Sequence, residues 1–503
     1  MNQKENGKKS SQTNAISGEK KQKSLTKNAA LNVIRTLMSL IFPLITFPYS
    51  SRILGPIYKG KVAFADSLVK YFAMFAALGI STYGTREVAK LRDDKEKLSA
   101  FVTEIFTINV ISMLCAYVLF AFTVIFVTQL ADYTTLLCIS STTILFNTLA
   151  MEYLYGGLEE YKYITIRAIF FQALSLVLLF VFVKKQEDYV KYAALHVVSS
   201  AGSCVFNFAH SRKFIKLGTR INFSLRRHLK PIFILFLSTV AINIYTVLDT
   251  TMLGFLKGDE SVGIYTCATR IDRIVLGMVT AATGVLFPRF SYYAQEHMKS
   301  KFESLMVKSF QVVVLLSIPC CIGLFMLATP LVSVFGGPRF FAAVPVMRIM
   351  SPIIIIIALK EVPANAMNAM GKEKERMCML FCAAAANFLA NLFLIRFFGA
   401  AGAAAASVLA ETISTAGPLI FMRKFLLKRE IFITTAQSLI SSFVMMASVF
   451  AISFFVNRNL FKVIFSAIAG AFVYALCLLL LKNKILKEVI AAAKTKIKAA
   501  KRK

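Results

Sequence analysis

The chain is built from long apolar blocks separated by short gaps that are rich in Lys and Arg. Of its 503 residues, 57% are hydrophobic, whereas a soluble globular domain has roughly 45 to 50%. A helix needs about 20 mostly apolar residues to cross a bilayer. The pattern excludes a soluble enzyme with one buried core and predicts an all-α polytopic membrane protein.

Fourteen apolar blocks are long enough to span a membrane once as helices. Because the gaps between them are short, consecutive spans should be antiparallel neighbours. The expected spans are 29–51, 62–84, 99–127, 134–154, 164–183, 189–210, 231–256, 261–285, 308–335, 342–368, 377–398, 401–422, 433–456 and 460–481.

The basic residues predict the orientation of these spans. The formal net charge is +32, and its Lys and Arg side chains fall mostly in every second gap. With the N-terminus inside, the cytoplasmic segments hold 40 of them and the outward gaps hold nine. Cytoplasmic loops carry such an excess, so we expect both termini in the cytoplasm. The same distribution argues against binding to nucleic acid.

The two ends of the chain are polar and basic. Residues 1–27 have no hydrophobic periodicity, so we expect a disordered cytoplasmic tail. Residues 482–503 place apolar side chains at helical spacing between lysines. That segment is either a basic amphipathic helix on the anionic lipids of the inner leaflet or a frayed, solvated tail.

Several basic side chains lie within spans, where an ionised group costs about 2.5 to 3.5 kcal/mol on insertion scales. Such residues normally face a water-filled cavity. Arg167, Lys191 and Arg396 are close to span ends and can extend to water. Arg52 lies at the outward edge and has either a structural or a binding role. The candidate lining of a cationic substrate cavity is Arg35, Arg52, Lys70, Arg270, Arg273, Arg348 and Lys360.

Acidic residues in the spans suggest a second role. Asp249 lies in the seventh span with no basic residue within a helical turn. It is a candidate for coupling to H⁺ or Na⁺, and a structural, hydrogen-bonded aspartate is the alternative. Asp66 and Glu361 are further candidates for ion coupling. Because fewer acids than bases stand alone in the spans, we expect the cavity to be net positive.

The eighth span has a polar face, and it also takes part in an internal repeat. Its small, hydroxylic and basic residues recur at steps of three and four, which places them on one helix face. With an offset of 203, Gly60 aligns with Gly263 and Lys70 with Arg273. We therefore expect two pseudo-symmetric six-helix lobes, 28–210 and 231–425. A cytoplasmic linker, 211–230, joins them, and two further helices follow in 433–481.

Motifs for catalysis are missing from the sequence. Its four histidines have no HExxH spacing, and there is no GxxxxGK[ST] loop for ATP. The nine cysteines all lie inside apolar blocks and form no disulfide framework. We expect a transporter, not an enzyme, with no metal site and no cofactor.

Four stretches carry a resemblance to a known family. They are Pro43 to Lys90, Gly156 to Arg167, Tyr245 to Phe255 and Val262 to Ile271. Together they resemble bacterial polysaccharide and O-antigen flippases of the multidrug/oligosaccharidyl-lipid/polysaccharide exporter superfamily. That superfamily also holds multidrug antiporters and the lipid II flippase. The similarity runs from about residue 28 to 425.

The resemblance implies a specific transport function. Two six-helix lobes would face each other across a cationic cavity in the bacterial inner membrane. The substrate would be an undecaprenyl-pyrophosphate-linked oligosaccharide, moved by alternating access for O-antigen, capsule or exopolysaccharide assembly, in partnership with polysaccharide polymerase machinery. The basic residues fit a pyrophosphate, since Arg makes bidentate bonds to phosphate. The alternatives are a lipid II flippase, a multidrug antiporter and, less favoured, a membrane-embedded glycan polymerase or ligase.

Overall fold

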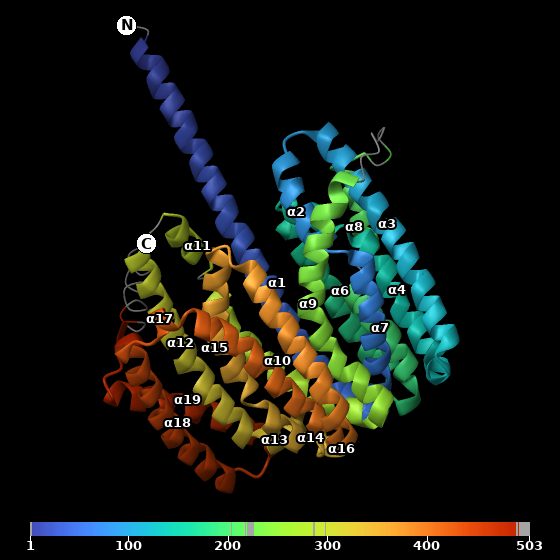
Figure 1. The fold of residues 1–503 in the computed structure, drawn as a ribbon, viewed down its shortest axis with the longest axis vertical. Coiled ribbons are helices and arrows are strands. Elements are labelled where there is room, and N and C mark those ends of the chain that lie inside the picture. Colours follow the sequence, from blue (N-terminus) through green and yellow to red (C-terminus); the bar gives the residue numbers. More distant parts are fainter. Residues whose placement is uncertain are drawn as a thin grey trace. The chain divides into compact units, whose positions relative to one another are not determined.

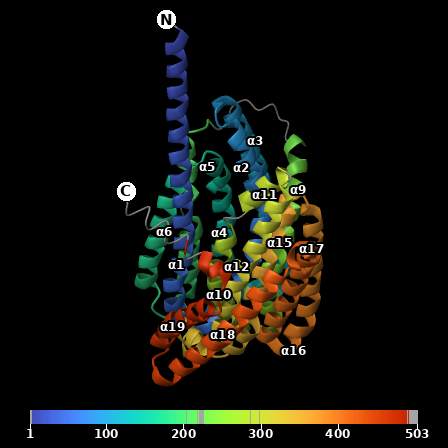
Figure 2. The same cartoon turned by 90° about the vertical axis from the view of Figure 1, so that its left-hand side faces the viewer.

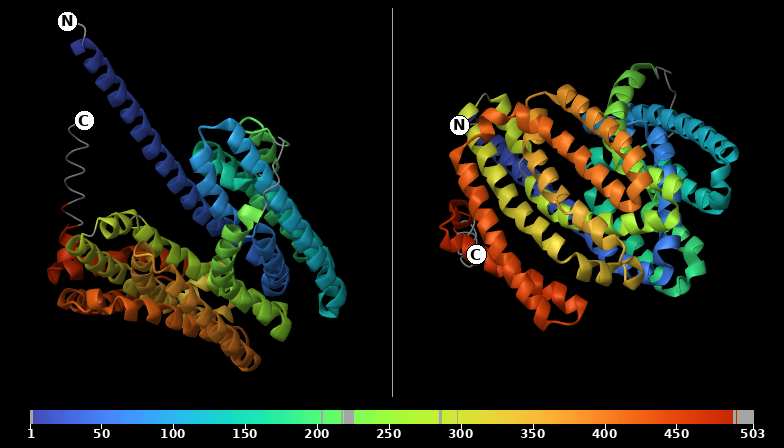
Figure 3. Two further views of the ribbon diagram at one scale, coloured as in Figure 1. Left: turned by 45° about the horizontal axis from the view of Figure 1, so that its top comes forward. Right: turned by 60° about the horizontal axis from the view of Figure 1, so that its bottom comes forward.

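The computed structural model describes residues 3–202, 204–216, 218, 226–284, 287–296, 298–488 and 491. Throughout these residues the regular elements are helices, in every view of the chain (Figures 1 and 3). The all-α prediction is therefore confirmed.

The helices vary widely in length, from a single turn to 75 residues. The α-helices are α1 (Gln3–Ala77), α2 (Ile80–Leu91), α3 (Lys95–Phe126), α4 (Thr134–Ala150), α5 (Glu152–Gly157), α6 (Tyr161–Phe182), α7 (Tyr189–Ala201), α8 (Cys204–Ser211), α9 (Arg226–Lys257), α10 (Asp259–Gly284), α11 (Phe287–Gln295), α12 (Lys299–Met326), α13 (Ala328–Phe335), α14 (Ala343–Met350), α15 (Ile353–Ala369), α16 (Glu373–Phe421), α17 (Arg423–Leu426), α18 (Arg429–Phe455) and α19 (Asn459–Leu480). Three 3₁₀ helices complete the set: η1 (Thr128–Tyr133), η2 (Gln186–Asp188) and η3 (Pro338–Phe340).

In the described residues, each of the fourteen expected spans coincides for most of its length with helix. Among the described residues, nine helical stretches are long and apolar enough to cross a membrane. Two of these, Ile41–Leu91 and Glu373–Phe421, have 51 and 49 residues, enough for two spans each. The expected spans at 189–210, 231–256 and 261–285 are not among the nine. The first is divided between α7 and α8, and the other two carry the polar residues of the site below. The chain is a multi-pass membrane protein.

The helices form two compact units. The first comprises Met1–Thr46 and Leu68–Val240, and the second comprises Phe47–Ser67 and Ala241–Lys503. The expected division into lobes differs in two places. The segment 47–67 groups with the second unit, and the start of α9 groups with the first. The last two helices, α18 and α19, lie side by side within the second unit (Figure 2).

The N-terminal segment differs from the prediction. The structure begins α1 at Gln3, where we expected a disordered tail over 1–27. Lys and Gln, which have high helix propensity, account for ten of residues 1–27. The segment also contains no proline, so helix can continue from the first span. At the other end, residues 484–488 are helical, but most of the expected amphipathic helix lies outside the described residues.

Two glycines divide long helices into pairs of spans. α1 breaks at Gly55, whose φ is 70°, and α16 breaks at Gly399, whose φ is 57°. A positive φ is accessible to glycine at little steric cost. Both breaks fall at the expected gaps between spans. Beyond the second break, Gly402 approaches the carbonyl oxygen of Leu394 so closely that a Cβ would lie 2.0 Å from it.

The outer faces of the helices are apolar. On α18 and α19, Phe454, Phe455, Phe472 and Leu480 are at least two-thirds exposed. An aqueous surface would not tolerate a continuous patch of this kind, but lipid tails do. These faces therefore contact the bilayer.

Candidate functional site

A cavity of about 300 Å³ with charged and apolar lining residues lies inside the second unit. Its walls come from α9, α10, α14, α15 and α16. Its charged lining residues are Asp249, Asp272, Arg273 and Glu411. Ionisable groups at membrane depth are costly, so their gathering around one cavity marks a functional site.

The centre of this site is the carboxylate of Asp249, which is 5% exposed. The amides of Asn387 and Asn391 donate to its Oδ1 at 3.0 and 2.6 Å. The hydroxyls of Tyr265 (at 2.6 Å) and Ser407 donate to its Oδ2. An ionised carboxylate can accept about four such bonds. Asp249 therefore has its acceptor capacity filled by neutral dipoles.

The break in α16 explains how this cluster forms. Asn387 and Asn391 precede Gly399, and Ser407 follows it. The two parts of α16 thus bring donors from both sides of the break to one carboxylate of α9. Asn387 and Asn391 are also four residues apart, which places both on one face of the helix.

The remaining charges of the cavity differ from the expected cationic lining. Nη2 of Arg273 lies 3.5 Å from the carbonyl oxygen of Thr246. The ammonium of Lys360 is buried and donates to Glu411 at 2.6 Å and to Ser414 at 3.2 Å. Its charge is therefore compensated within the protein. With three carboxylates in its lining, one of them paired with Lys360, against one arginine, this cavity has no net positive charge. The cationic cavity expected between the lobes stays a prediction.

Four other expected cationic residues lie in different surroundings. Arg52 donates to the carbonyl oxygen of Val334 at 3.0 Å, so it holds a backbone segment in place. Arg348 is exposed, and its guanidinium lies 5.7 Å from the centre of the Phe325 ring. Arg270 is half-buried in α10, one turn from Arg273. Lys70 is exposed in the first unit.

The last of the expected site residues are not part of this cavity. Arg35 belongs to α1, but its side chain is outside the described part of the chain. Asp66 and Glu361 are partly buried, and neither lines the cavity. Of the three candidates for ion coupling, the structure thus places Asp249 at the polar centre.

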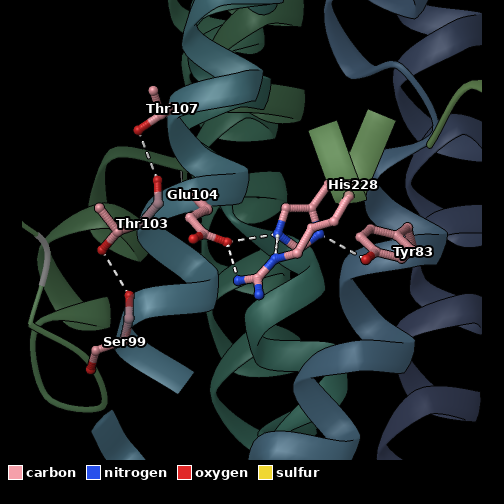
Figure 4. A network of polar contacts seen from close by, with 7 residues as sticks. Tyr83, Ser99, Thr103, Glu104, Thr107 and His228 are labelled. Atoms are coloured by element: carbon pink, nitrogen blue, oxygen red, sulfur yellow. Dashed lines mark hydrogen bonds and ion pairs between the residues drawn. The ribbon is translucent and has the colours of Figure 1, made fainter. Parts of the chain in front are cut away.

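The first unit has its own buried polar cluster, shown in Figure 4. Glu104 of α3 accepts a bond of 2.6 Å from Arg227, and its Oε2 also lies 2.7 Å from Nε2 of His228. The other ring nitrogen of His228 lies 2.8 Å from the hydroxyl of Tyr83. Glu104 and His228 are 2% and 3% exposed. The cluster ties the start of α9 to α2 and α3.

Sequence reasoning overlooked several of these residues. Glu104 and Glu411 both fall within expected spans, where an acidic residue is a strong signal of a buried polar site. The prediction of a net positive cavity left both of them out. The amides of Asn387 and Asn391 stand in the apolar run FCAAAANFLANLFLIRFF with the same spacing as neighbours on a helix face. Two amides at this spacing in such a run could have predicted a polar site on this face of the helix, but not its partner.

The sequence matches two known protein families. Residues 25–294 match the family described as polysaccharide biosynthesis protein. The chain belongs to this family. Residues 235–393 also match the MatE family.

Two relatives of this polysaccharide biosynthesis protein are similar over most of their length. A candidate O-antigen transporter of Escherichia coli (strain K12) is 27% identical over 410 residues, which cover 80% of this chain and 97% of that protein. A second candidate O-antigen transporter, from Shigella dysenteriae, is 23% identical over 75% of this chain and 95% of that protein.

Solved structures share the fold. The lipid II flippase MurJ, in an inward closed conformation, superposes with a TM-score of 0.71 at 15% identity, over 90% of this chain and 98% of that one. An inward-facing multidrug resistance transporter of the MATE family gives a TM-score of 0.55 at 12% identity, over 78% and 97%. The prediction of an exporter-superfamily fold is confirmed.

Proposed function

We propose that this protein is a secondary transporter that flips undecaprenyl-pyrophosphate-linked oligosaccharides from the cytoplasmic to the outer leaflet of the bacterial inner membrane. The family match and the O-antigen transporter names of its relatives support a glycan substrate. The transporter fold favours movement of a lipid-linked molecule over a catalytic role. The polysaccharide polymerase machinery would then use the flipped product.

One observation carries the transport mechanism, namely the buried carboxylate of Asp249 beside the cavity. Its four donors are neutral, so no cation in the described part of the chain bonds to it directly. Within the described residues, Oδ1 of the adjacent Asn391 is buried and has no hydrogen-bond partner. A free carbonyl oxygen and a neighbouring carboxylate are suitable ligands for a hard cation.

The coupling ion is Na⁺ or H⁺. A sodium ion would take the carboxylate of Asp249 and the free oxygen of Asn391 as ligands, and would displace at least one of the four donors to Asp249. A proton would instead remove part of the acceptor capacity of Asp249, and at least one of its four donors would then have to turn away. In either case the ion changes the network that joins α9, α10 and the two parts of α16. Such a change gives the ion differential affinity for two conformations, as coupling requires.

The pyrophosphate of the substrate needs positive partners, and Arg270 and Arg273 are the first candidates. They lie one turn apart on α10, and Arg273 opens to the cavity. Guanidinium groups bind phosphate bidentately. An inside-negative membrane potential assists export of negative charge by about 2.3 kcal/mol per elementary charge for each 100 mV.

The proposal is tested by the lipid that accumulates when the protein is absent. Cells that lack the protein should accumulate the lipid-linked oligosaccharide on the inner leaflet and lose surface glycan. The wild-type chain should restore the glycan, whereas Arg273→Ala should not, at equal protein level in the membrane. Restoration by Arg273→Ala would contradict the assignment of the pyrophosphate site. Normal glycan in the deletion strain would contradict the function.

The charge of the cavity favours one alternative function, the export of cationic drugs. With Glu411 paired to Lys360, Asp249 and Asp272 still outnumber Arg273 in its lining, and carboxylates attract organic cations. A drug antiporter would raise resistance to such compounds and would leave surface glycan unchanged in the deletion strain. A lipid II flippase is distinguished by rescue of cells depleted of peptidoglycan precursor export.

A further inference from the structure

A second pocket, in the first unit, contains a buried arginine with free donors. Arg167 of α6 has a side chain that is only 8% exposed. Among the described residues, its Nε and Nη1 are buried without a hydrogen-bond partner. Oε1 of Glu152 lies 4.0 Å from Nη2, on a side chain that is 56% exposed. The expected extension of Arg167 to water is thus not observed, and a buried guanidinium without partners is costly.

Aromatic rings hold this guanidinium in place. Its central carbon lies 5.9 Å from the centre of the Tyr163 ring. Tyr163 stacks on His210 with 4.0 Å between ring centres, and its hydroxyl donates to the carbonyl oxygen of Phe206 at 3.1 Å. The stack joins α6 to α8 beside Arg167. The free donors are covered in this conformation, so a ligand reaches them after a small movement of the side chains around them.

The pocket beside Arg167 has basic lining residues and an apolar wall. It measures about 610 Å³ and is lined by residues of α6, α8 and the turn after α8. Besides Arg167, the lining includes the exposed Lys162 and Lys213, and Glu160 is its one acid. Phe170 and Phe206 form part of the wall and are 61% and 59% exposed.

We propose that this pocket binds the phosphate headgroup of an anionic phospholipid, such as phosphatidylglycerol. The phosphate oxygens accept bonds from the guanidinium of Arg167, whose unpartnered donors thereby gain acceptors, and Lys162 and Lys213 add electrostatic attraction. The acyl chains lie along the apolar wall. Because 155–163 and 211–230 are expected cytoplasmic gaps, the lipid belongs to the inner leaflet, whose anionic lipids attract basic segments. This proposal does not depend on the proposed transport function.

The shape of the pocket favours a phospholipid over other anions. Exposed Phe side chains give a soluble phosphate nothing to bind, but they match two acyl chains. A volume of about 610 Å³ is in the range of sites for ligands of a few hundred daltons. It suits one headgroup with the first methylenes of its chains, and not a pyrophosphate that carries several sugars.

The test uses the full-length protein in a neutral detergent and counts bound lipids by native mass spectrometry. Phosphatidylglycerol and phosphatidylcholine are titrated in parallel. The wild type should bind the anionic lipid more tightly, and Arg167→Gln should weaken that binding at least tenfold, since it removes charge-assisted hydrogen bonds to the phosphate. Lys213→Gln, on an exposed side chain that cannot disturb folding, should weaken it about twofold to threefold.

Controls separate the site from general charge effects. Arg423→Gln removes the same charge from an exposed helix of the second unit and should leave the affinity unchanged. Equal affinity of the wild type for both lipids would overturn the proposal. So would unchanged binding of phosphatidylglycerol by Lys213→Gln and by an Arg167→Gln protein with wild-type melting temperature. Equal competition by inorganic phosphate, or tighter binding of undecaprenyl pyrophosphate, would also overturn it by assigning the pocket to another anion.

Discussion

Gly60 and Gly263 lie at a crossing of two helices in the second unit, where their backbones touch. A Cβ on Gly60 would lie 1.7 Å from the carbonyl oxygen of Asp259 and 2.7 Å from the amide nitrogen of Gly263. A Cβ on Gly263 would lie 1.9 Å from the carbonyl oxygen of Pro56. Small residues let membrane helices approach this closely. The crossing fixes the segment after the Gly55 break against the start of α10.

Replacement of either crossing glycine should destabilise the protein. Overpacking costs about 1 to 3 kcal/mol, and Gly60→Ala should reach the upper end because its Cβ meets backbone, which cannot rotate away. The measurement is thermal unfolding in detergent. Gly323→Ala is the matched control, since its added Cβ meets nothing within 4 Å. A helix gains about 0.5 to 1 kcal/mol of stability when Gly is replaced by Ala, so Gly323→Ala should not lower the melting temperature. Equal melting temperatures of Gly60→Ala and Gly323→Ala would contradict the close contact at the crossing.

The buried pair Lys360 and Glu411 should be strongly coupled. Lys360→Met alone leaves a buried carboxylate without its cation, which costs about 3 to 5 kcal/mol. The double variant Lys360→Met with Glu411→Leu removes both charges and should be close to wild type in stability. A double-mutant cycle on the free energy of unfolding measures the coupling. If the losses in the free energy of unfolding of the two single variants simply add up in the double variant, the interaction between Lys360 and Glu411 contributes no stability.

Asp249→Asn should uncouple transport from the ion gradient. The variant places an amide opposite the four donors of the site, which leaves buried donors unpaired at about 1 to 3 kcal/mol. Flipping in proteoliposomes should respond to a Na⁺ or pH gradient in the wild type and not in the variant. Asp132→Asn, on an exposed residue of η1, is the control. If a folded Asp249→Asn protein still flips its substrate in response to the gradient, Asp249 has only a structural role.

The N-cap of α3 should make stability depend on pH. Asp94 accepts from the side chain of Lys97 at 2.9 Å and from the backbone amides of Lys97 and Glu96. The hydrogen bond from the Lys97 side chain is the main cause that lowers the pKa of Asp94, and the backbone bonds add to it. A carboxyl whose pKa is lowered by folding stabilises the protein above its ordinary pKa, and this contribution is lost as the pH falls through the lowered value.

The pH prediction is checked with Asp94→Asn, which keeps a capping side chain but cannot titrate. Between neutral pH and pH 3, the melting temperature of the wild type should fall more than that of the variant. The difference should be small, because Asp94 is at the surface. Parallel curves for the two proteins would contradict the assignment of this titration to Asp94.

The sequence alone determined the fold class and the positions of the membrane-spanning helices. Apolar blocks of about 20 residues can satisfy their backbone hydrogen bonds in lipid only as helices, so their length and spacing locate the spans. The gaps at 52–61 and 399–400 were predicted for the same reason, and each coincides with a glycine at positive φ. The isolation of Asp249 within a span also singled it out without knowledge of its neighbours.

The tertiary structure decided which charges meet. Asn387 and Ser407 are separated by the break at Gly399 and both reach Asp249 of another helix, a meeting that no spacing along the chain predicts. Lys360 was expected to line a cationic cavity, but packing places it against Glu411, 51 residues later. A sequence records the sign of a charge and its helix face, whereas compensation depends on which faces pack together. For the same reason, only the structure revealed that Arg167 lies buried beside a pocket, and not extended to water.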